Sequence, residues 1–205
     1  MKIITISREF GSGGRELGKR LAEELGIHCY DHEIIELIAK EHGFDERYVA
    51  NISEKCIEAA YPTTIGHRFA MPPVQIMDQG FQVAAAQQQI IENFAKQGDC
   101  VIVGRCANFI LKGRPNLFSV FLHADPATRM QRVVENYGVS PRSVARTMDT
   151  MDSRRRNHCL HYTGQELGNA RLYDLCINTS DYGLERTAEP VSYTHLRAHE
   201  TCADL

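Results

Sequence analysis

The sequence predicts an α/β fold in which helices cover both faces of a parallel β-sheet. Five short apolar segments alternate along the chain with segments of helical periodicity. The five segments are residues 3–7, 27–30, 100–103, 117–122 and 173–178. Strands that alternate with helices favour a parallel sheet that is buried on both faces. Three glycines within residues 11–14 mark a tight turn between the first strand and the first helix.

The size and charge of the chain limit the classes of protein to consider. Its 205 residues suit one domain with a full hydrophobic core. The 23 Lys and Arg residues nearly balance the 26 Asp and Glu residues, so the net charge of −3 gives no reason to expect nucleic acid or a membrane as a partner. No apolar run reaches the roughly 18 residues of a membrane span, and the N-terminus lacks the layout of a signal peptide. We therefore expect a soluble cytoplasmic protein, and the sequence carries no signal for its oligomeric state.

The cysteines indicate neither disulfides nor a metal site. They are seven in number, scattered along the chain and without CxxC spacing, a pattern that favours reduced thiols. Residues 158–161 group one cysteine with two histidines, and this segment lacks a second pair of ligands. We predict no structural metal.

The first third of the chain is predicted to alternate between strand and helix. Leu17, Leu21 and Leu25 mark the buried face of the first helix. The second strand ends at Asp31, which can cap the helix that follows and that ends at Gly43.

The middle of the chain contains the segment with the weakest pattern. A short helix is predicted over residues 45–55, and the prolines and glycine of residues 61–73 predict mainly loop. Residues 78–96 then have the apolar spacing of a long helix.

The last part of the chain is predicted to hold three helices. Asp125-Pro126 opens one through residue 136, because Asp caps a helix and Pro fits its first turn. Ser140-Pro141 opens the next by the same logic, and this helix leads into three arginines at residues 154–156. A final short helix follows the fifth strand, over residues 181–188.

The segment after residue 189 does not fit this pattern. Residues 190–201 offer no apolar face for packing and resemble translated read-through of a sequencing adaptor. We therefore expect residues 190–205 to be a non-native tail, with the native C-terminus missing.

Two registers of the phosphate-binding pattern G-x-x-x-x-G-K-[ST] compete in the glycine turn. The literal register begins at Gly13 and uses Lys19, but Lys19 then faces solvent because Leu17 lies on the buried face. The preferred register begins at Arg8, where the strand ends, and places Gly14 at the lysine position. A strand, a glycine turn and a helix in this order aim backbone N–H groups at a phosphate.

The preferred register lacks both the lysine and the hydroxyl that binds Mg²⁺. Arg15 or Arg8 can supply the missing positive charge, since guanidinium groups suit phosphate oxygens. Glu16 can reach Mg²⁺ through water, and we predict no direct protein ligand for the metal. The alternative is a glycine-rich turn that binds nothing.

Further arginines indicate a second phosphate. Arg105 follows a strand, at the edge of the sheet where α/β proteins bind ligands, although a surface ion pair is the alternative there. Arg142, Arg146 and residues 154–156 together predict a basic flap beside the phosphate loop. Phosphoryl transfer requires such positive charge around the transferring oxygens.

The order of these features resembles that of the cytidylate kinase-like proteins, relatives of bacterial cytidylate kinase among the P-loop nucleoside monophosphate kinases. The resemblance covers residues 1–188. Its motifs are SREFGSGGREL at residues 7–17, VIVGRCA at 101–107 and YTGQ with YDLCINTS at 162–180.

The resemblance implies a three-layer P-loop NTPase fold with a five-stranded parallel sheet in the order 2-3-1-4-5. Residues 1–189 would form one domain, with a helical monophosphate-binding insertion over about 32–98 and a lid over about 140–172. Asp31 and Arg105 would face the monophosphate, and Arg155 would be the lid arginine. The residues implied to hold the ATP phosphates are Gly11, Ser12, Gly13, Gly14, Arg15 and Glu16.

The chain also departs from the pattern of cytidylate kinases at three positions. Those enzymes have the loop lysine where Gly14 stands, an Asp where Cys106 follows the Gly-Arg pair, and an arginine where Leu37 stands. The fold therefore transfers from the family more directly than the substrate does.

We predict an ATP- and Mg²⁺-dependent kinase that phosphorylates a nucleoside monophosphate, with CMP or dCMP as first choice. Arg15, Arg105 and Arg155 are the predicted catalytic residues, and small nucleotides are the predicted partners. The alternatives are a kinase for another small phosphate acceptor and a nucleotide-binding regulatory protein with little turnover. A third is a dinucleotide-binding oxidoreductase, since Asp31 follows the glycines by about 20 residues.

Overall fold

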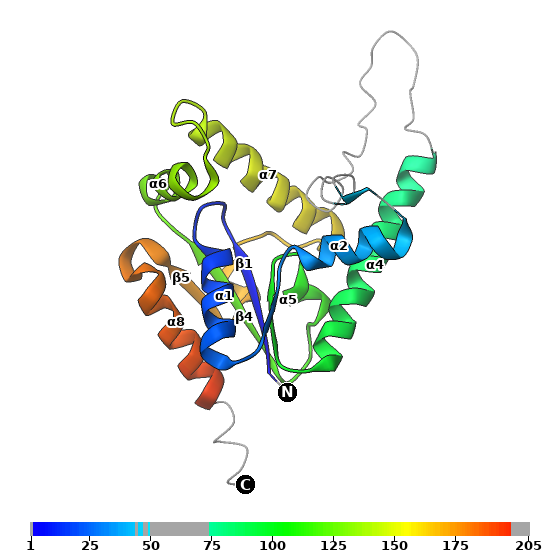
Figure 1. Ribbon diagram of the computed structural model, residues 1–205, viewed down its shortest axis with the longest axis horizontal. Helices are drawn as coiled ribbons and strands as arrows, with labels where there is room; N and C mark the ends of the chain where they lie inside the picture. The colour runs from blue at the N-terminus through cyan, green and yellow to red at the C-terminus, as the bar shows by residue number, and fades with distance from the viewer. Residues whose placement is uncertain (1, 44, 47–48, 50–73, 198–205) are drawn as a thin grey trace.

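The structure is a computed structural model that describes residues 2–43, 45–46, 49 and 74–197. Its centre is a five-stranded sheet between two layers of helices (Figure 1). The strands are β1 (Ile3–Arg8), β2 (His28–Tyr30), β3 (Cys100–Val103), β4 (Leu117–His123) and β5 (Leu175–Asn178). Their order is β2-β3-β1-β4-β5 and each described pairing is parallel, which confirms the predicted sheet.

Helices connect the strands and cover the sheet. They are α1 (Gly14–Leu25), α2 (Glu33–His42), α4 (Val74–Gln97), α5 (Ala107–Ile110), α6 (Pro126–Tyr137), α7 (Val144–Thr163) and α8 (Thr179–Arg197), with a short 3₁₀ helix at Ala170–Leu172. Among the described helices, none is both long enough and apolar enough to cross a membrane.

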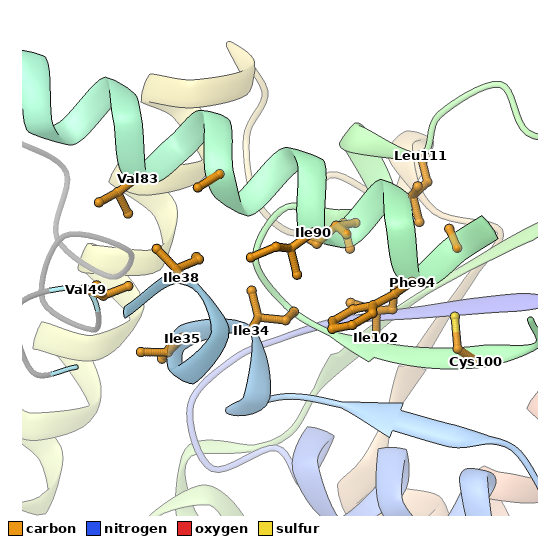
Figure 2. Close-up of a cluster of buried hydrophobic side chains, with 14 of the residues drawn as sticks. Ile34, Ile35, Ile38, Val49, Val83, Ile90, Phe94, Cys100, Ile102 and Leu111 are labelled. Atoms are coloured by element: carbon orange, nitrogen blue, oxygen red, sulfur yellow. The ribbon is translucent and has the colours of Figure 1, made fainter. Parts of the chain in front are cut away.

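The alternation of side chains along β1 divides the core into two halves. Ile4 and Ile6 are fully buried and belong to the cluster that α1 and α8 cover. Ile3 points to the other face, where α2 and α4 close the second cluster. Figure 2 shows this second cluster, with Ile38 of α2 and Ile90 of α4 facing each other. Both faces of the sheet are therefore dry, as the apolar strands predict.

The carboxyl ends of the parallel strands lie at one edge of the sheet. The loops that leave β1, β2 and β3 begin at this edge, because all three strands run in the same direction. Helix α7 passes across the same edge (Figure 1). Residues far apart in sequence are thereby brought to one place.

Two helix boundaries differ from those predicted. Residues 141–143 form a turn, closed by the Ser143 N–H donating to the Ser140 carbonyl over 2.9 Å, so α7 begins at Val144 rather than at Ser140-Pro141. Helix α7 also continues to Thr163, which places the arginine run in its middle rather than at its end.

The last helix is longer than the predicted 181–188. Helix α8 extends to Arg197, with a non-helical residue at Gly183. Val191 is fully buried in the cluster beneath α1, so an apolar contact exists where the periodicity predicts none. The non-native origin of the tail stays a prediction, and residues 198–205 lie outside the described part of the chain.

The predictions for the middle segment are tested only at its end. Most of the helix predicted over 45–55 and all of the loop predicted over 61–73 lie outside the described residues. The long helix predicted over 78–96 is α4, and it begins four residues earlier, at Val74.

Candidate active site

The loop between β1 and α1 forms an uncapped helix N-terminus. Gly11 and Gly13 have φ of +81° and +89°, a conformation that other residues adopt only under strain. A Cβ atom at Gly11 would lie 2.8 Å from Val133, and one at Gly13 would overlap Leu184. Gly13 is also the N-cap of α1 and no side chain caps the helix there. The first turn of α1 therefore keeps free backbone N–H groups that can donate hydrogen bonds to a phosphate.

A cavity of about 250 Å³ opens beside this loop and gathers most of the predicted site. Five segments contribute a charged side chain to its wall. They are the end of β1, the first turn of α1, the loop after β2, the turn after β3 and the middle of α7. The predicted site residues that line it are Arg8, Gly11, Gly13, Gly14, Arg15, Asp31, Arg105 and Arg155. The structure therefore brings together three predicted phosphate contacts that are up to 140 positions apart in sequence, Arg15, Arg105 and Arg155.

Two predicted loop residues, Ser12 and Glu16, do not line this cavity. Ser12 is fully buried, and its hydroxyl donates to the Glu9 carbonyl over 2.9 Å. Its own carbonyl accepts a hydrogen bond from the Thr179 hydroxyl, also over 2.9 Å. Ser12 therefore holds the loop against α8 rather than facing a ligand.

Glycine at the lysine position makes room for an arginine. A Cβ atom at Gly14 would lie 2.8 Å from Cγ of Arg8, and one at Gly104 would overlap Nη1 of Arg8. The Arg8 side chain thus crosses the loop between two glycines and delivers a guanidinium group to the cavity. Lys19 is exposed and does not line the cavity, which agrees with the preferred register.

Asp31 positions the arginines of the phosphate loop. Nε of Arg15 donates to its carboxylate over 2.6 Å, and Nη2 of Arg8 lies 3.8 Å from it. Burial opposes the charge of Arg15, but the charge of Asp31 and this hydrogen bond outweigh burial and raise the pKa of Arg15. His32, not Asp31, is the N-cap of α2, so the predicted capping role of Asp31 is wrong.

The turn after β3 is strained. Gly104, Arg105 and Cys106 have φ of +80°, +55° and +53°, and two of them carry side chains. Such residues cost of order 1–3 kcal/mol each and persist where the surroundings enforce them. The amide of Gln87 on α4 donates to the Arg105 carbonyl over 3.2 Å and helps to fix this turn.

Among the predicted flap arginines, Arg155 lines the cavity beside the glycine loop. Its Nη1 donates to the Arg8 carbonyl over 3.4 Å, and its guanidinium lies 5.4 Å from the Phe10 ring centroid. Arg142 and Arg146 are exposed and do not line the cavity. The predicted basic flap is therefore reduced to one arginine of α7 over the phosphate loop.

An ion pair that the sequence analysis missed attaches α7 to the loop. Asp152 accepts the Phe10 N–H over 2.7 Å and pairs with Arg129 of α6. Arg129 also donates to the Phe10 carbonyl over 2.7 Å and lies 3.1 Å from the Glu9 carboxylate. The sequence does contain a sign of this role. Asp152 follows Val144 and Met148 at intervals of four residues, so it lies on the buried face of α7.

Glu16 fits an indirect role with Mg²⁺. It lies in the first turn of α1, and its Oε2 is buried without a hydrogen-bond partner in the described part of the protein. Carboxylate oxygens are preferred Mg²⁺ ligands, and Mg²⁺ keeps several waters. The described residues contain no cluster of three or more metal-ligating side chains, so phosphates and water would complete the coordination.

Several known proteins are similar to this chain in sequence. The model of the cytidylate kinase-like family matches residues 3–181. The cytidylate kinase of Pyrococcus horikoshii is 27% identical over 184 residues, which are 89% of this chain and 82% of that protein. The cytidylate kinase of Methanopyrus kandleri is 24% identical over 194 residues, covering 90% and 88%.

Solved structures give the same fold. An uncharacterized protein of Eubacterium ventriosum has a TM-score of 0.71 and 27% identity, covering 95% of this chain and 98% of that one. Two kinases are similar in fold alone. A gluconokinase of Sinorhizobium meliloti has a TM-score of 0.57 and 16% identity, covering 98% of this chain and 95% of that one. A shikimate kinase of Acinetobacter baumannii has a TM-score of 0.53 and 14% identity, covering 97% of this chain and 95% of that one.

Proposed function

This chain belongs to the cytidylate kinase-like family and is a nucleoside monophosphate kinase, and we propose that it uses ATP and Mg²⁺ to phosphorylate CMP or dCMP. The observation that carries the proposal is the convergence of Arg8, Arg15, Arg105 and Arg155 on one cavity beside an uncapped helix N-terminus. One set of donors suits the ATP phosphates, and arginines from other elements suit an acceptor phosphate.

The reaction is a direct in-line transfer. An oxygen of the acceptor phosphate attacks the γ-phosphorus of ATP, and the bond from that phosphorus to the β–γ bridging oxygen breaks, which leaves ADP. The loop N–H groups, Arg8 and Arg15 hold the donor, Arg105 holds the acceptor, and Arg155 neutralises charge on the transferring group. No covalent enzyme intermediate forms, so no nucleophilic side chain is needed.

A bound Mg²⁺ would offset the negative charge of the donor phosphates. Glu16 would hold a metal-bound water through its orphaned carboxylate oxygen. The neighbouring loop residues contribute N–H groups rather than metal ligands.

The test is an assay of the full chain with ATP, Mg²⁺ and each nucleoside monophosphate in turn. We expect CDP or dCDP as the main product, formed at a higher kcat/KM than the diphosphates of other bases. A stronger preference for another monophosphate would overturn CMP as the acceptor while leaving the kinase class in place.

A regulatory nucleotide-binding protein is the second candidate, because glycine replaces the loop lysine at Gly14. Stoichiometric ATP binding without a diphosphate product from any acceptor would select it. Binding of NADH without ATP would select the oxidoreductase, which the family assignment and the arginine-lined cavity disfavour.

A further inference from the structure

Two cysteines from different elements meet beside the arginines of the candidate active site. Cys106 lies in the strained turn after β3, and Cys159 lies on α7. Both line a narrow cavity of about 50 Å³ whose wall also includes Arg8, Arg105 and Arg155. The side chain of Cys159 is hydrogen-bonded to that of Cys106. The fold therefore brings two thiols that are far apart in sequence into direct contact.

A small molecule can reach this pair of cysteines. Both are thiols in the structure rather than halves of a disulfide. Cys106 is partly exposed, and Cys159 is 8% exposed but forms part of the cavity wall. A reagent of the size of a peroxide can therefore meet either sulfur.

The Cys159 thiol ionises more readily than the other buried thiols. Its hydrogen bond with Cys106 lowers the pKa of Cys159, burial opposes this effect, and Thr163, whose Oγ1 lies 3.6 Å from Sγ, lowers the pKa further. Burial instead raises the pKa of Cys29 and of Cys100 to about 11. Because the thiolate is the form that reacts, Cys159 is more reactive than these two cysteines.

Each cysteine of the pair is close in sequence to an arginine of the candidate active site. Cys106 directly follows Arg105, and Cys159 lies about one helical turn after Arg155 on α7. A covalent bond between the two sulfurs would therefore fix the helix that carries Arg155 against the turn that carries Arg105. Elements that cover an active site must move to exchange substrate and product.

We propose that Cys106 and Cys159 form a site of reversible oxidation, at which a hydroperoxide converts the two thiols into a disulfide between the turn after β3 and α7. This bond holds α7 over the arginine-lined cavity and slows turnover. The formation of the disulfide is independent of the proposed function, and its effect on turnover rests on that function.

The chemistry takes place in two steps and consumes one peroxide. The Cys159 thiolate attacks a peroxide oxygen, so that an S–O bond forms, the O–O bond breaks and the leaving hydroxide takes up a proton to become water. The Cys106 thiolate then attacks the Cys159 sulfur, an S–S bond forms and the S–O bond breaks. The second hydroxide also leaves as water. Two thiols lose two electrons and two protons, and the peroxide is reduced to two waters.

Peptide mapping tests whether the disulfide forms. The reduced full chain is treated with hydrogen peroxide, alkylated and digested with trypsin. Cleavage after arginine and lysine isolates Cys106 in residues 106–112 and Cys159 in residues 157–171, each as the single cysteine of its peptide. We expect these two peptides to be joined and to separate on treatment with dithiothreitol. No joined peptide, or a disulfide between other cysteines instead, would overturn the proposal.

Turnover measurements test what the disulfide does. Peroxide should lower the kcat of the wild-type chain about tenfold, because α7 can no longer move away from the cavity. Dithiothreitol should restore it, whereas it does not reduce methionine sulfoxide. Cys106→Ser and Cys159→Ser, each compared with its own reduced form, should keep their kcat after peroxide.

Cys176→Ser is the matched control, since it removes an exposed cysteine of β5. It should lose kcat with peroxide as the wild type does. An equal and lasting loss in all four proteins would show that oxidation acts elsewhere and would overturn the proposal.

The two measurements separate failure of this inference from failure of the proposed function. If the chain makes no diphosphate, the joined peptide still tests the oxidation site, and its appearance would support the site without the activity. A joined peptide in an active kinase whose kcat is unchanged would overturn the effect on turnover.

Discussion

At the scale of single residues, the positive charge of the phosphate loop comes from arginine rather than lysine. Arg15 lines the cavity and is held by Asp31, whereas Lys19 is exposed and outside it. We expect Arg15→Ala to lower kcat/KM about a hundredfold, because it removes a cation that we propose faces the transferring phosphoryl group. Lys19→Ala is the control and should change the rate less than twofold. Equal losses in steady-state assays of both variants would favour the literal register.

Gly104 shows how one missing Cβ positions a guanidinium group. Its φ is +80°, and a Cβ there would overlap Nη1 of Arg8. Gly104→Ala should therefore displace Arg8, raise the KM of nucleotides and lower the free energy of unfolding by about 1–2 kcal/mol. Gly98→Ala is a matched control, since nothing lies within 4 Å of a Cβ there. Urea unfolding and nucleotide titration measure both effects, and an unchanged KM in Gly104→Ala would contradict this role for Arg8.

At the scale of elements, α7 is attached to the phosphate loop by Asp152 and Arg129. Both are buried, and each binds the backbone of Phe10. This arrangement couples the helix that carries Arg155 to the loop that we propose holds ATP. Movement of α7 and ordering of the loop are therefore expected to occur together.

Breaking this ion pair should affect both stability and nucleotide binding. Asp152→Asn removes one of the two carboxylates that pair with the buried Arg129 and leaves Glu9 as its charged partner, so we expect the free energy of unfolding to fall by about 1–3 kcal/mol. The KM of ATP should rise as well, because the Phe10 N–H loses a charged acceptor. Asp149→Asn, on the exposed face of the same helix, should change neither quantity. A stability loss with an unchanged KM for ATP would show that the pair only packs α7 against α6.

At the scale of the whole molecule, the buried neutral His158 makes folding depend on pH. Its pKa is about 4 in the folded state, where burial is the main cause, and near 6.5 in the unfolded chain. Between these values the unfolded state binds more protons than the folded state. The free energy of unfolding is therefore highest above pH 6.5 and decreases as the pH falls toward 4. The difference corresponds to about 3 kcal/mol.

Thermal or urea unfolding between pH 7 and pH 4 measures this contribution. His158→Gln should flatten the pH dependence of the free energy of unfolding, because the variant has no proton to take up at this position. His161→Gln should change the slope less than His158→Gln does, because His161 is exposed and is the smallest of the three causes that lower the pKa of His158. The same slope in all three proteins would contradict a neutral buried His158.

Much of the architecture followed from local sequence patterns. The five strands lie within a few residues of their predicted positions, because buried strands need short apolar runs whatever they pack against. The turn at residues 11–14 was equally predictable, since its glycine requirement belongs to the backbone. The strand order came from the family resemblance rather than from these patterns.

Local sequence patterns predicted only part of the candidate site. Arg105 was predicted because it follows a strand, and all parallel strands end at one edge. The observed roles of Asp31 and Ser12 were not predicted. A carboxylate or a hydroxyl can cap a helix, form a bridge or face a ligand, and its neighbours in sequence do not decide among these roles. Arg142 was predicted with Arg155, yet only packing decides which side of α7 meets the loop.

The sequence alone determined the alternation of strands and helices, the phosphate loop and the family, because each depends on short-range patterns. Tertiary structure decided what the loop contains. Gly14 leaves space that Arg8 fills, and Asp152 reaches the N–H of Phe10 across 142 positions of sequence. Such pairings depend on how α6 and α7 pack over the sheet edge, and no local pattern encodes a distance between elements that meet only in the folded chain.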